Sequence, residues 1–162
     1  MSNWESLVRE HGPLIYVTAK RILGHAADAE DVSQEVLIEA HRLGQSRQVR
    51  SWPGLLRRLT TCRAIDRLRQ RKAHAPLAGT LRDAAAGPEE AAMARELTER
   101  LRQALTQLPP REAEVFCLRY FDDLSYEQIA ELLDVQVGAV AAALHKARGR
   151  LEGLLTEAVR GA

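Results

Sequence analysis

Apolar side chains recur at three- and four-residue intervals along most of the chain, the pattern of helices that bury one face. In the first such segment Trp4, Leu7 and Val8 share one stripe, and the dipeptide Gly12-Pro13 predicts a kink. No segment alternates with the two-residue period of a strand, so we expect an all-α fold. The predicted helices cover residues 4–23, 25–43, 52–72, 93–108, 110–121, 125–133 and 137–158.

One segment interrupts this helical pattern. Residues 74–92, HAPLAGTLRDAAAGPEEAA, hold two Pro, two Gly and seven Ala, a composition typical of a flexible linker. The linker divides the 162 residues into 1–73 and 93–162, and each part is long enough to bury a modest helical core. The sequence therefore predicts two small helical domains joined by a tether.

The second of these parts contains a helix, a short turn and another helix. In LSYEQIAELLDVQVGAVAAALHKARGRL, residues 124–151, the quartet SYEQ forms a capping box that begins the first helix. The tight turn and small Ala130 favour a DNA-binding helix-turn-helix over a plain helical hairpin, whose inner faces would look the same. The side chains expected to face inward are Ile129, Leu132, Leu133, Val137, Val140, Leu144 and Leu151.

The outward face of the second helix carries little that could read a base sequence. Alanine has no donor or acceptor for base edges, whereas Lys146 and Arg150 can hold phosphates without specifying sequence. Residues 93–162 also carry 9 Lys/Arg against 11 Asp/Glu, a net charge of −2 that disfavours DNA binding by this part alone. The outward residues, which we take as candidate DNA contacts, are Ala139, Ala142, Ala143, Lys146 and Arg150.

Charge is unevenly distributed in the first part. Residues 25–41 hold five acids and no Lys or Arg, whereas residues 42–73 hold ten Lys/Arg and the single acid Asp66. This division indicates a basic partner for one segment and an acidic partner for the other, the alternative being two solvated helix faces. The arginines of 52–72 suit a phosphate backbone. Trp52 could stack on an unpaired base, although a core position is the more usual role of such an aromatic.

The sequence offers little support for catalysis or cofactor binding. The five histidines form no metal-binding pair, Cys62 and Cys117 have no metal-ligand spacing, and a phosphate-cradling Gly-Lys-Ser/Thr loop is absent. We therefore expect neither an enzyme nor a bound metal or cofactor. Two distant cysteines, the lack of an apolar signal core and the lack of a long apolar run indicate a cytoplasmic protein that does not insert into membranes.

Three blocks of the chain together resemble a known family. DAEDVSQEVLIEAHR, SWPGLLRRLTTCRAIDRLRQRK and LPPREAEVFCLRYFDDLSYEQIAELLDVQVGAVAAALHKARGRL are similar, in this order, to bacterial RNA polymerase sigma factors of the extracytoplasmic-function group. The resemblance covers nearly the whole chain. It implies a factor that binds core RNA polymerase and promoter DNA, with an anti-sigma factor as a further partner.

The resemblance also implies roles for individual residues. Residues 1–73 match the domain that docks on the polymerase clamp, where Asp31, Gln34 and Glu35 fall on the clamp-binding motif. Residues 44–51 match the loop that captures a flipped base, and residues 93–162 match the domain that binds the polymerase flap and the -35 element. The residues that would lie at the melted -10 region are Trp52, Arg57, Arg58, Thr61, Arg63 and Arg67.

The chain departs from the family pattern at the helix that should read DNA. The family commonly has lysine, serine and arginine where this chain has Ala141, Ala142 and Ala143, and its usual basic residue is Gly149 here. We therefore expect the second domain to dock and position, while most sequence choice lies in the first domain or in another protein. Two other hypotheses remain open: a free-standing helix-turn-helix regulator, and a sigma-like interaction protein that reads DNA poorly.

Overall fold

The computed structural model describes residues 3–73 and 88–161, and within these ranges all regular structure is helical. The predicted all-α fold is confirmed. Most of the predicted linker, residues 74–87, lies outside the described residues. No helix in the described ranges is both long and apolar enough to cross a membrane.

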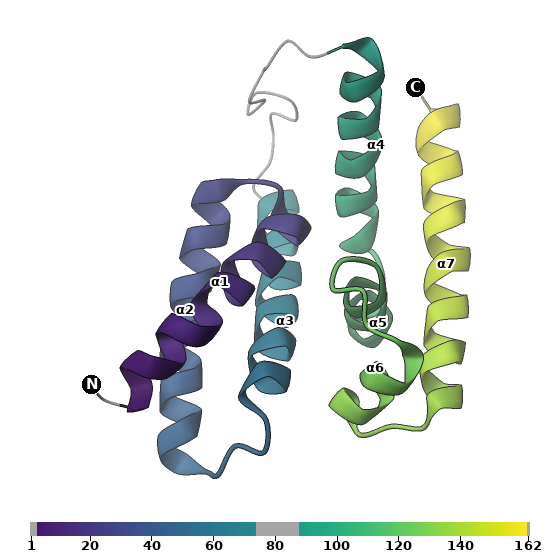
Figure 1. Cartoon of the computed structure of the whole chain (residues 1–162). Coiled ribbons are helices and arrows are strands. Elements are labelled where there is room, and N and C mark those ends of the chain that lie inside the picture. Colours follow the sequence, from purple (N-terminus) through teal and green to yellow (C-terminus); the bar gives the residue numbers. More distant parts are fainter. Residues whose placement is uncertain (1–2, 74–87, 162) are drawn as a thin grey trace.

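The first module is a bundle of three long helices (Figure 1). These are α1 (Asn3–Leu23), α2 (Ala26–Ser46) and α3 (Trp52–Ala73), and each packs on the other two. Helix α1 runs unbroken through Pro13, so the predicted kink does not end it. Gly24 then turns the chain at φ +77°, a conformation in which a side chain would be strained.

The second module consists of α4 (Glu89–Leu105), α5 (Pro110–Tyr120), α6 (Tyr126–Leu133) and α7 (Val137–Arg160). The predicted capping box is present, since Ser125 Oγ accepts from the Gln128 N–H and the Gln128 side chain accepts from the Ser125 N–H. Asp134, at φ 55°, ends α6 and turns the chain into α7. The predicted helix-turn-helix is thus α6, a short turn and α7.

Helix α4 differs from its predicted bounds, because it begins at Glu89 and ends at Leu105 rather than covering 93–108. The first turn contains Glu89 and Glu90, whose negative charges favour a helix N-terminus. The alanine and proline content of residues 74–92 predicts a linker there, and this prediction undervalues the acidic pair.

The two modules share one hydrophobic core. Buried residues of α1 and α3, among them Ile15 and Leu56, belong to the same cluster as Leu105 and Phe116 of the second module. A smaller cluster, which includes Leu118, lies between α5, α6 and α7. The modules are therefore packed together in a closed arrangement.

One expectation about the inner faces of the helix-turn-helix was wrong. Val137 is 42% exposed, because it occupies the first turn of α7, beyond the reach of the smaller cluster's buried residues. Leu132 packs against the smaller cluster as expected, but it is only half-buried. It also lies beside the first module, where a Cβ placed on Gly54 would be 3.1 Å from its methyl group.

Candidate nucleic-acid interface

The N-terminal half of α7 presents mostly methyl groups. Ala139 and Ala142 are exposed, Ala143 is half-buried against the smaller core cluster, and Lys146 is exposed. Gln136 precedes the helix without forming a side-chain cap. Because none of the three alanines offers a donor or acceptor, the part of this face that they form cannot read base edges through hydrogen bonds.

The remaining candidate on α7 is engaged inside the second module. Arg150 Nε lies 2.9 Å from Glu112 Oε2, and the Glu112 side chain is only 10% exposed. The pair links α7 to α5. Arg150 could hold a DNA phosphate only by sharing its guanidinium with this buried carboxylate.

The arginines on one side of α3 form ion pairs with the acidic helix α2. Arg67 lies 2.8 Å from Glu35, 3.5 Å from Asp28 and 3.6 Å from Asp31. Arg63 donates to Glu39 from Nε over 2.9 Å. Much of the opposite charge that the sequence places in separate segments is therefore matched inside the first module. The charges of Arg63 and Arg67 are thus already paired with carboxylates and are not free to bind a phosphate.

The clamp-binding candidates nevertheless reach the surface of α2. Asp31, Gln34 and Glu35 are all exposed and share one helical stripe. The stripe continues to Ile38, which is 61% exposed although it is a large apolar side chain. Sequence reasoning missed Ile38. The available signal was its position, because it lies outside the buried stripe of α2 while extending the acidic one.

A different side of α3 faces the second module. Arg58 Nε donates to Glu114 Oε1 on α5 over 2.9 Å, and the Glu114 side chain is 9% exposed. Arg57 Nη1 lies 3.9 Å from Asp122 Oδ1. Two of the four arginines that the resemblance assigns to the melted strand are thus turned toward carboxylates of the second module.

Thr61 is fully buried, and its hydroxyl makes no hydrogen bond. It lies in the middle of α3, which packs on α1, α2 and the second module. The predicted contact between Thr61 and DNA cannot occur while this residue is covered. Apolar periodicity did not predict that Thr61 is buried, because α3 packs against other helices on several sides and so buries polar positions as well.

Asp122 is a buried carboxyl group at the module boundary. Its Oδ1 accepts a hydrogen bond from Thr18 Oγ1 of α1 over 3.0 Å, while its Oδ2 has no hydrogen-bond partner. Burial raises the pKa of Asp122, an effect that the Thr18 hydrogen bond and the charges of Arg57 and Arg21 oppose. Because burial is the larger influence, the ion pair with Arg57 does not fully offset the cost of placing this charge between the modules.

Trp52 is half-buried at the first position of α3 and packs against the hydrophobic core. Its ring lies against Gly44, where a Cβ would come within 2.8 Å of the ring. The position supports the core role weighed for this residue, and Gly44 provides the space that the indole needs. A stacking role would have to use the part of the ring that remains accessible.

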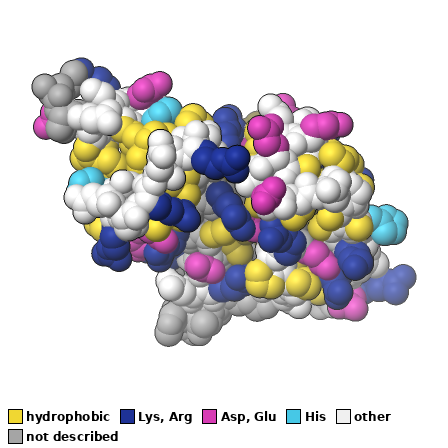
Figure 2. Space-filling model, turned by 90° about the horizontal axis from the view of Figure 1, so that it is seen from below, with side chains coloured by type: hydrophobic (Ala, Val, Ile, Leu, Met, Phe, Trp, Pro, Cys, Tyr) yellow, Lys and Arg dark blue, Asp and Glu magenta, His cyan; other side chains and the backbone are white. Residues whose placement is uncertain are grey.

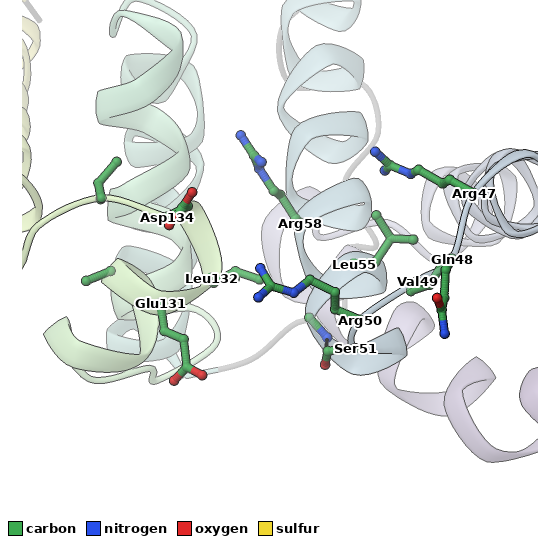
Figure 3. A pocket seen from close by; sticks show the side chains of 13 residues that line it. Arg47, Gln48, Val49, Arg50, Ser51, Leu55, Arg58, Glu131, Leu132 and Asp134 are labelled. Atoms are coloured by element: carbon green, nitrogen blue, oxygen red, sulfur yellow. Dashed lines mark hydrogen bonds between the residues drawn. The ribbon is translucent and has the colours of Figure 1, made fainter.

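A cavity of about 720 Å³ opens between the loop before α3 and the helix-turn-helix (Figure 3). Arg47, Gln48 and Arg50 line one side, and Glu131 and Asp134 line the other. The side chains of Arg47 and Arg50 form no hydrogen bond or ion pair within the described residues. Figure 2 views this end of the molecule and shows Lys and Arg side chains gathered across its middle. We did not single out these two arginines from sequence, although the loop itself was predicted.

The described residues offer no reactive or metal-binding centre. Burial raises the pKa of the Cys62 thiol to about 11, and it also raises the pKa of Cys117, which is fully buried. Thiols held in the neutral form are poor nucleophiles. No group of His, Cys, Asp and Glu among the described residues is arranged to hold a metal ion.

Two family models match separate parts of the chain. Residues 7–74 match the family model Sigma-70 region 2, and residues 98–151 match the model Sigma-70, region 4. The chain is 32% identical over 169 residues to ECF RNA polymerase sigma factor SigE of Mycolicibacterium smegmatis, spanning 97% of this chain and 63% of that protein. It is 33% identical over 159 residues to ECF RNA polymerase sigma factor SigW of Bacillus subtilis, spanning 88% of this chain and 83% of that protein.

Two solved structures share the fold. One is CnrH in complex with the cytosolic domain of CnrY, with a TM-score of 0.57, 24% identity and coverage of 95% of this chain and 88% of the other. The second is the sigma factor RpoE in complex with the anti-sigma factor NepR from Bartonella quintana, with a TM-score of 0.57, 19% identity and coverage of 96% and 98%. The two matched regions and the relatives of 32% and 33% identity lead to one conclusion: this chain belongs to the extracytoplasmic-function (ECF) group of RNA polymerase sigma factors.

Proposed function

We propose that this sigma factor binds core RNA polymerase through the exposed stripe of α2 and directs it to promoters. The observation that carries the proposal is the surface formed by Asp31, Gln34, Glu35 and Ile38. Three of these residues fall on the motif that the resemblance assigns to clamp binding, and all four remain exposed although Arg67 pairs with two of the acids. An apolar side chain flanked by acids suits a partner surface that is basic around an apolar contact.

The first module also carries the side chains best able to hold separated DNA strands. Arg47, Gln48 and Arg50 lie in the loop before α3, and Arg57 and Arg58 follow on α3 itself. Arginine and glutamine can donate to phosphates and to base edges. We assign -10 recognition and strand capture to this loop and to the beginning of α3, with Trp52, Arg63 and Arg67 as supporting residues whose side chains also stabilise the module.

The second module has a positioning role in this proposal. Its α7 offers Lys146, Arg148 and Arg150 for phosphates, and alanine methyl groups where base-reading side chains are expected. Such a helix fixes the placement of a protein on DNA more than it selects a sequence. The alternative of a free-standing helix-turn-helix regulator therefore lacks the reading side chains it would need.

The two modules must separate on a promoter. The -35 and -10 elements are about 25 base pairs apart, a distance of about 85 Å at 3.4 Å per base pair. Helix α7 has 24 residues, so the longest helix of the closed arrangement spans about 36 Å. The two modules therefore have to move apart on a promoter. A protein partner that keeps them together would act as an anti-sigma factor, the kind of partner named in the NepR complex.

Reconstitution with core RNA polymerase tests the proposal. We expect the purified chain to co-purify with core polymerase. We also expect the reconstituted mixture of the chain and core polymerase to support run-off transcription. Failure to bind core polymerase would favour the free-standing regulator. Binding without transcription from any genomic promoter fragment would favour the interaction protein.

A further inference from the structure

The two modules are held together by polar contacts as well as by the shared core. On the α3 side, Arg58 donates to the nearly buried carboxylate of Glu114 over 2.9 Å. On the α1 side, Arg102 of α4 donates to the carbonyl oxygens of Ile22 and Arg21, over 2.9 and 3.2 Å. These carbonyls end α1 and have no partner within that helix, so Arg102 caps α1 from the other module.

The Arg102 cap fits closely against the turn that follows α1. A Cβ placed on Gly24 would lie 2.6 Å from the Arg102 guanidinium carbon, so the space depends on the absence of a side chain there. The Arg102 side chain is 15% exposed, and Glu99 on its own helix lies 3.1 Å away and orients it. Arg102 is therefore a well-packed, largely buried side chain that contacts the other module.

The contact made by Arg58 has a specific chemistry. A carboxylate and a phosphate present the same kind of charged oxygen acceptor to a guanidinium group. Glu114 thus satisfies Arg58 in the way that a strand phosphate would. Thr61, the neighbour of Arg57 and Arg58 that the resemblance places at the melted strand, is fully buried on the same helix.

We propose that the second module is an internal competitor of single-stranded DNA, in which Glu114 occupies Arg58 and the Arg102 cap holds the modules closed. The inference rests on the proposed function, because it takes α3 as a strand-binding helix. In the closed state α3 binds the strand weakly, and the observed affinity is reduced by the fraction of molecules that are open. Polymerase binding that separates the modules would uncover the strand-binding surface only when it is needed.

The substitution Arg102→Gln separates this proposal from simple electrostatics. It removes a positive charge far from Glu114, so charge alone predicts weaker DNA binding. The competitor proposal predicts tighter binding, because losing the cap favours the open state. The probe is a fluorescein-labelled single-stranded oligonucleotide of mixed sequence, titrated with the full chain at constant salt and followed by anisotropy.

Opening itself is measured at a native thiol. Cys117 is fully buried in the core shared by the modules. Its labelling by N-ethylmaleimide, followed by mass spectrometry of the peptide that contains it, reports exposure of the boundary. We expect Arg102→Gln to accelerate labelling about fivefold, the effect of one lost net hydrogen bond, and to tighten oligonucleotide binding at least twofold. Unchanged labelling, or weaker binding, overturns the proposal.

A second variant removes the competitor group. Glu114→Gln keeps the shape of the side chain but loses the charge that holds Arg58, and we expect faster labelling of Cys117 and tighter oligonucleotide binding. The matched control is Glu152→Gln, an exposed position on α7 with the same charge change. Equal gains in both variants would assign the effect to net charge and would contradict the proposal. Circular dichroism of each variant identifies loss of fold, in which case the Arg102→Gln result decides.

These measurements do not depend on polymerase. If wild-type chain fails in run-off transcription while Arg102→Gln still opens the modules and tightens strand binding, the proposed function falls and the internal competition stands. If transcription succeeds and neither variant changes labelling or strand affinity, the proposed function stands and the competition falls.

Discussion

The two surfaces that resemble parts of a transcription factor use their charges differently. On α2 and α3 of the first module, acids and arginines pair with one another, with Arg67 reaching three carboxylates. On α7 of the second module, the positions that should read DNA carry alanines that are exposed or half-buried and bear no charge. The first surface has many charged groups that are already engaged, and the second is accessible with few groups to offer.

This difference teaches that a run of charge in a sequence does not by itself identify a partner. The acidic segment 25–41 and the basic segment 42–73 suggested two separate partners. In the structure many of these charges are each other's partners, and the surface available to other molecules consists of side chains that the ion pairs leave exposed. The α2 stripe and the loop cations Arg47 and Arg50 meet that description.

The largest expected effect concerns the α2 stripe. Reversing the charges of Asp31 and Glu35 would place two cations against Arg67 and damage the fold, so neutral substitutions are the cleaner test. We expect the combined variant Asp31→Asn, Gln34→Ala and Glu35→Gln to weaken binding to core polymerase on the order of 100-fold, as loss of a polar and charged contact cluster does. Surface plasmon resonance with immobilised core polymerase measures this, and Gln103→Ala, an exposed glutamine of the second module, is the control. Undiminished binding would place the polymerase contact elsewhere.

A smaller effect compares ion pairs in the two modules. Arg67→Gln removes the cation that Asp31 and Glu35 share, while Asp28 keeps its ion pair with Arg71. We expect the substitution to lower the free energy of unfolding by about 1 to 2 kcal/mol. Arg100→Gln breaks only an i,i+4 pair with Glu96 on α4 and should cost about 0.5 kcal/mol or less. Urea denaturation at low and high salt measures both changes. Equal losses of unfolding free energy in the two variants would show that the Arg67 cluster of the first module is no stronger than the single ion pair of the second.

The exposed alanines of α7 can be replaced by side chains that donate hydrogen bonds to DNA. Ala141 and Ala142 are exposed, whereas Ala143 is half-buried, so Ala141→Lys with Ala142→Arg adds two cations without disturbing the core. We expect -35 duplex binding to tighten about tenfold, with a salt dependence steeper by about two ions. The control, Thr156→Lys with Ala158→Arg, adds the same charge at the other end of α7. If both pairs act alike, the N-terminal half of α7 does not face DNA.

The smallest effect is expected at Asp122. Burial raises the pKa of this carboxyl, so the folded state favours the protonated form; its stabilising contribution is present below the ordinary carboxyl pKa and is lost as the pH rises through the raised value. Asp122→Asn has no charge to bury, so its stability relative to wild type should rise over that pH range, reaching about 1 kcal/mol at neutral pH. Thermal unfolding at acidic and neutral pH follows the difference, and a variant less stable at neutral pH would show that the Arg57 ion pair outweighs burial.

The arrangement of helices was largely predictable from sequence. Apolar periodicity located the seven helices of the described residues, and SYEQ correctly predicted the capping box of α6. The predictions of helix bounds and burial were wrong where two local sequence signals disagree. The acidic pair Glu89 and Glu90 begins α4 inside an alanine-rich segment, and Val137 lies beyond the core although it fits the apolar spacing of α7.

The candidate site was less predictable, because its state depends on contacts between segments far apart in sequence. No local pattern indicates that Arg58 meets Glu114, that Thr61 is covered, or that Arg102 caps α1. Likewise, Ile38 differs from a core residue only by its angle on α2. Residue type and spacing identified the surfaces, whereas their availability required the packing of the two modules.

One measurement tests directly whether the first module selects the promoter sequence while the second only positions the protein. Run-off transcription is performed with reconstituted polymerase on two libraries of a mapped promoter, one randomised at the -10 element and the other at the -35 element, followed by sequencing of the transcribed templates. We predict strong sequence selection at -10 and little at -35, since the proposal assigns base reading to the first module and a positioning role to the alanine-bearing helix α7. Stronger selection at -35 than at -10 would contradict this assignment.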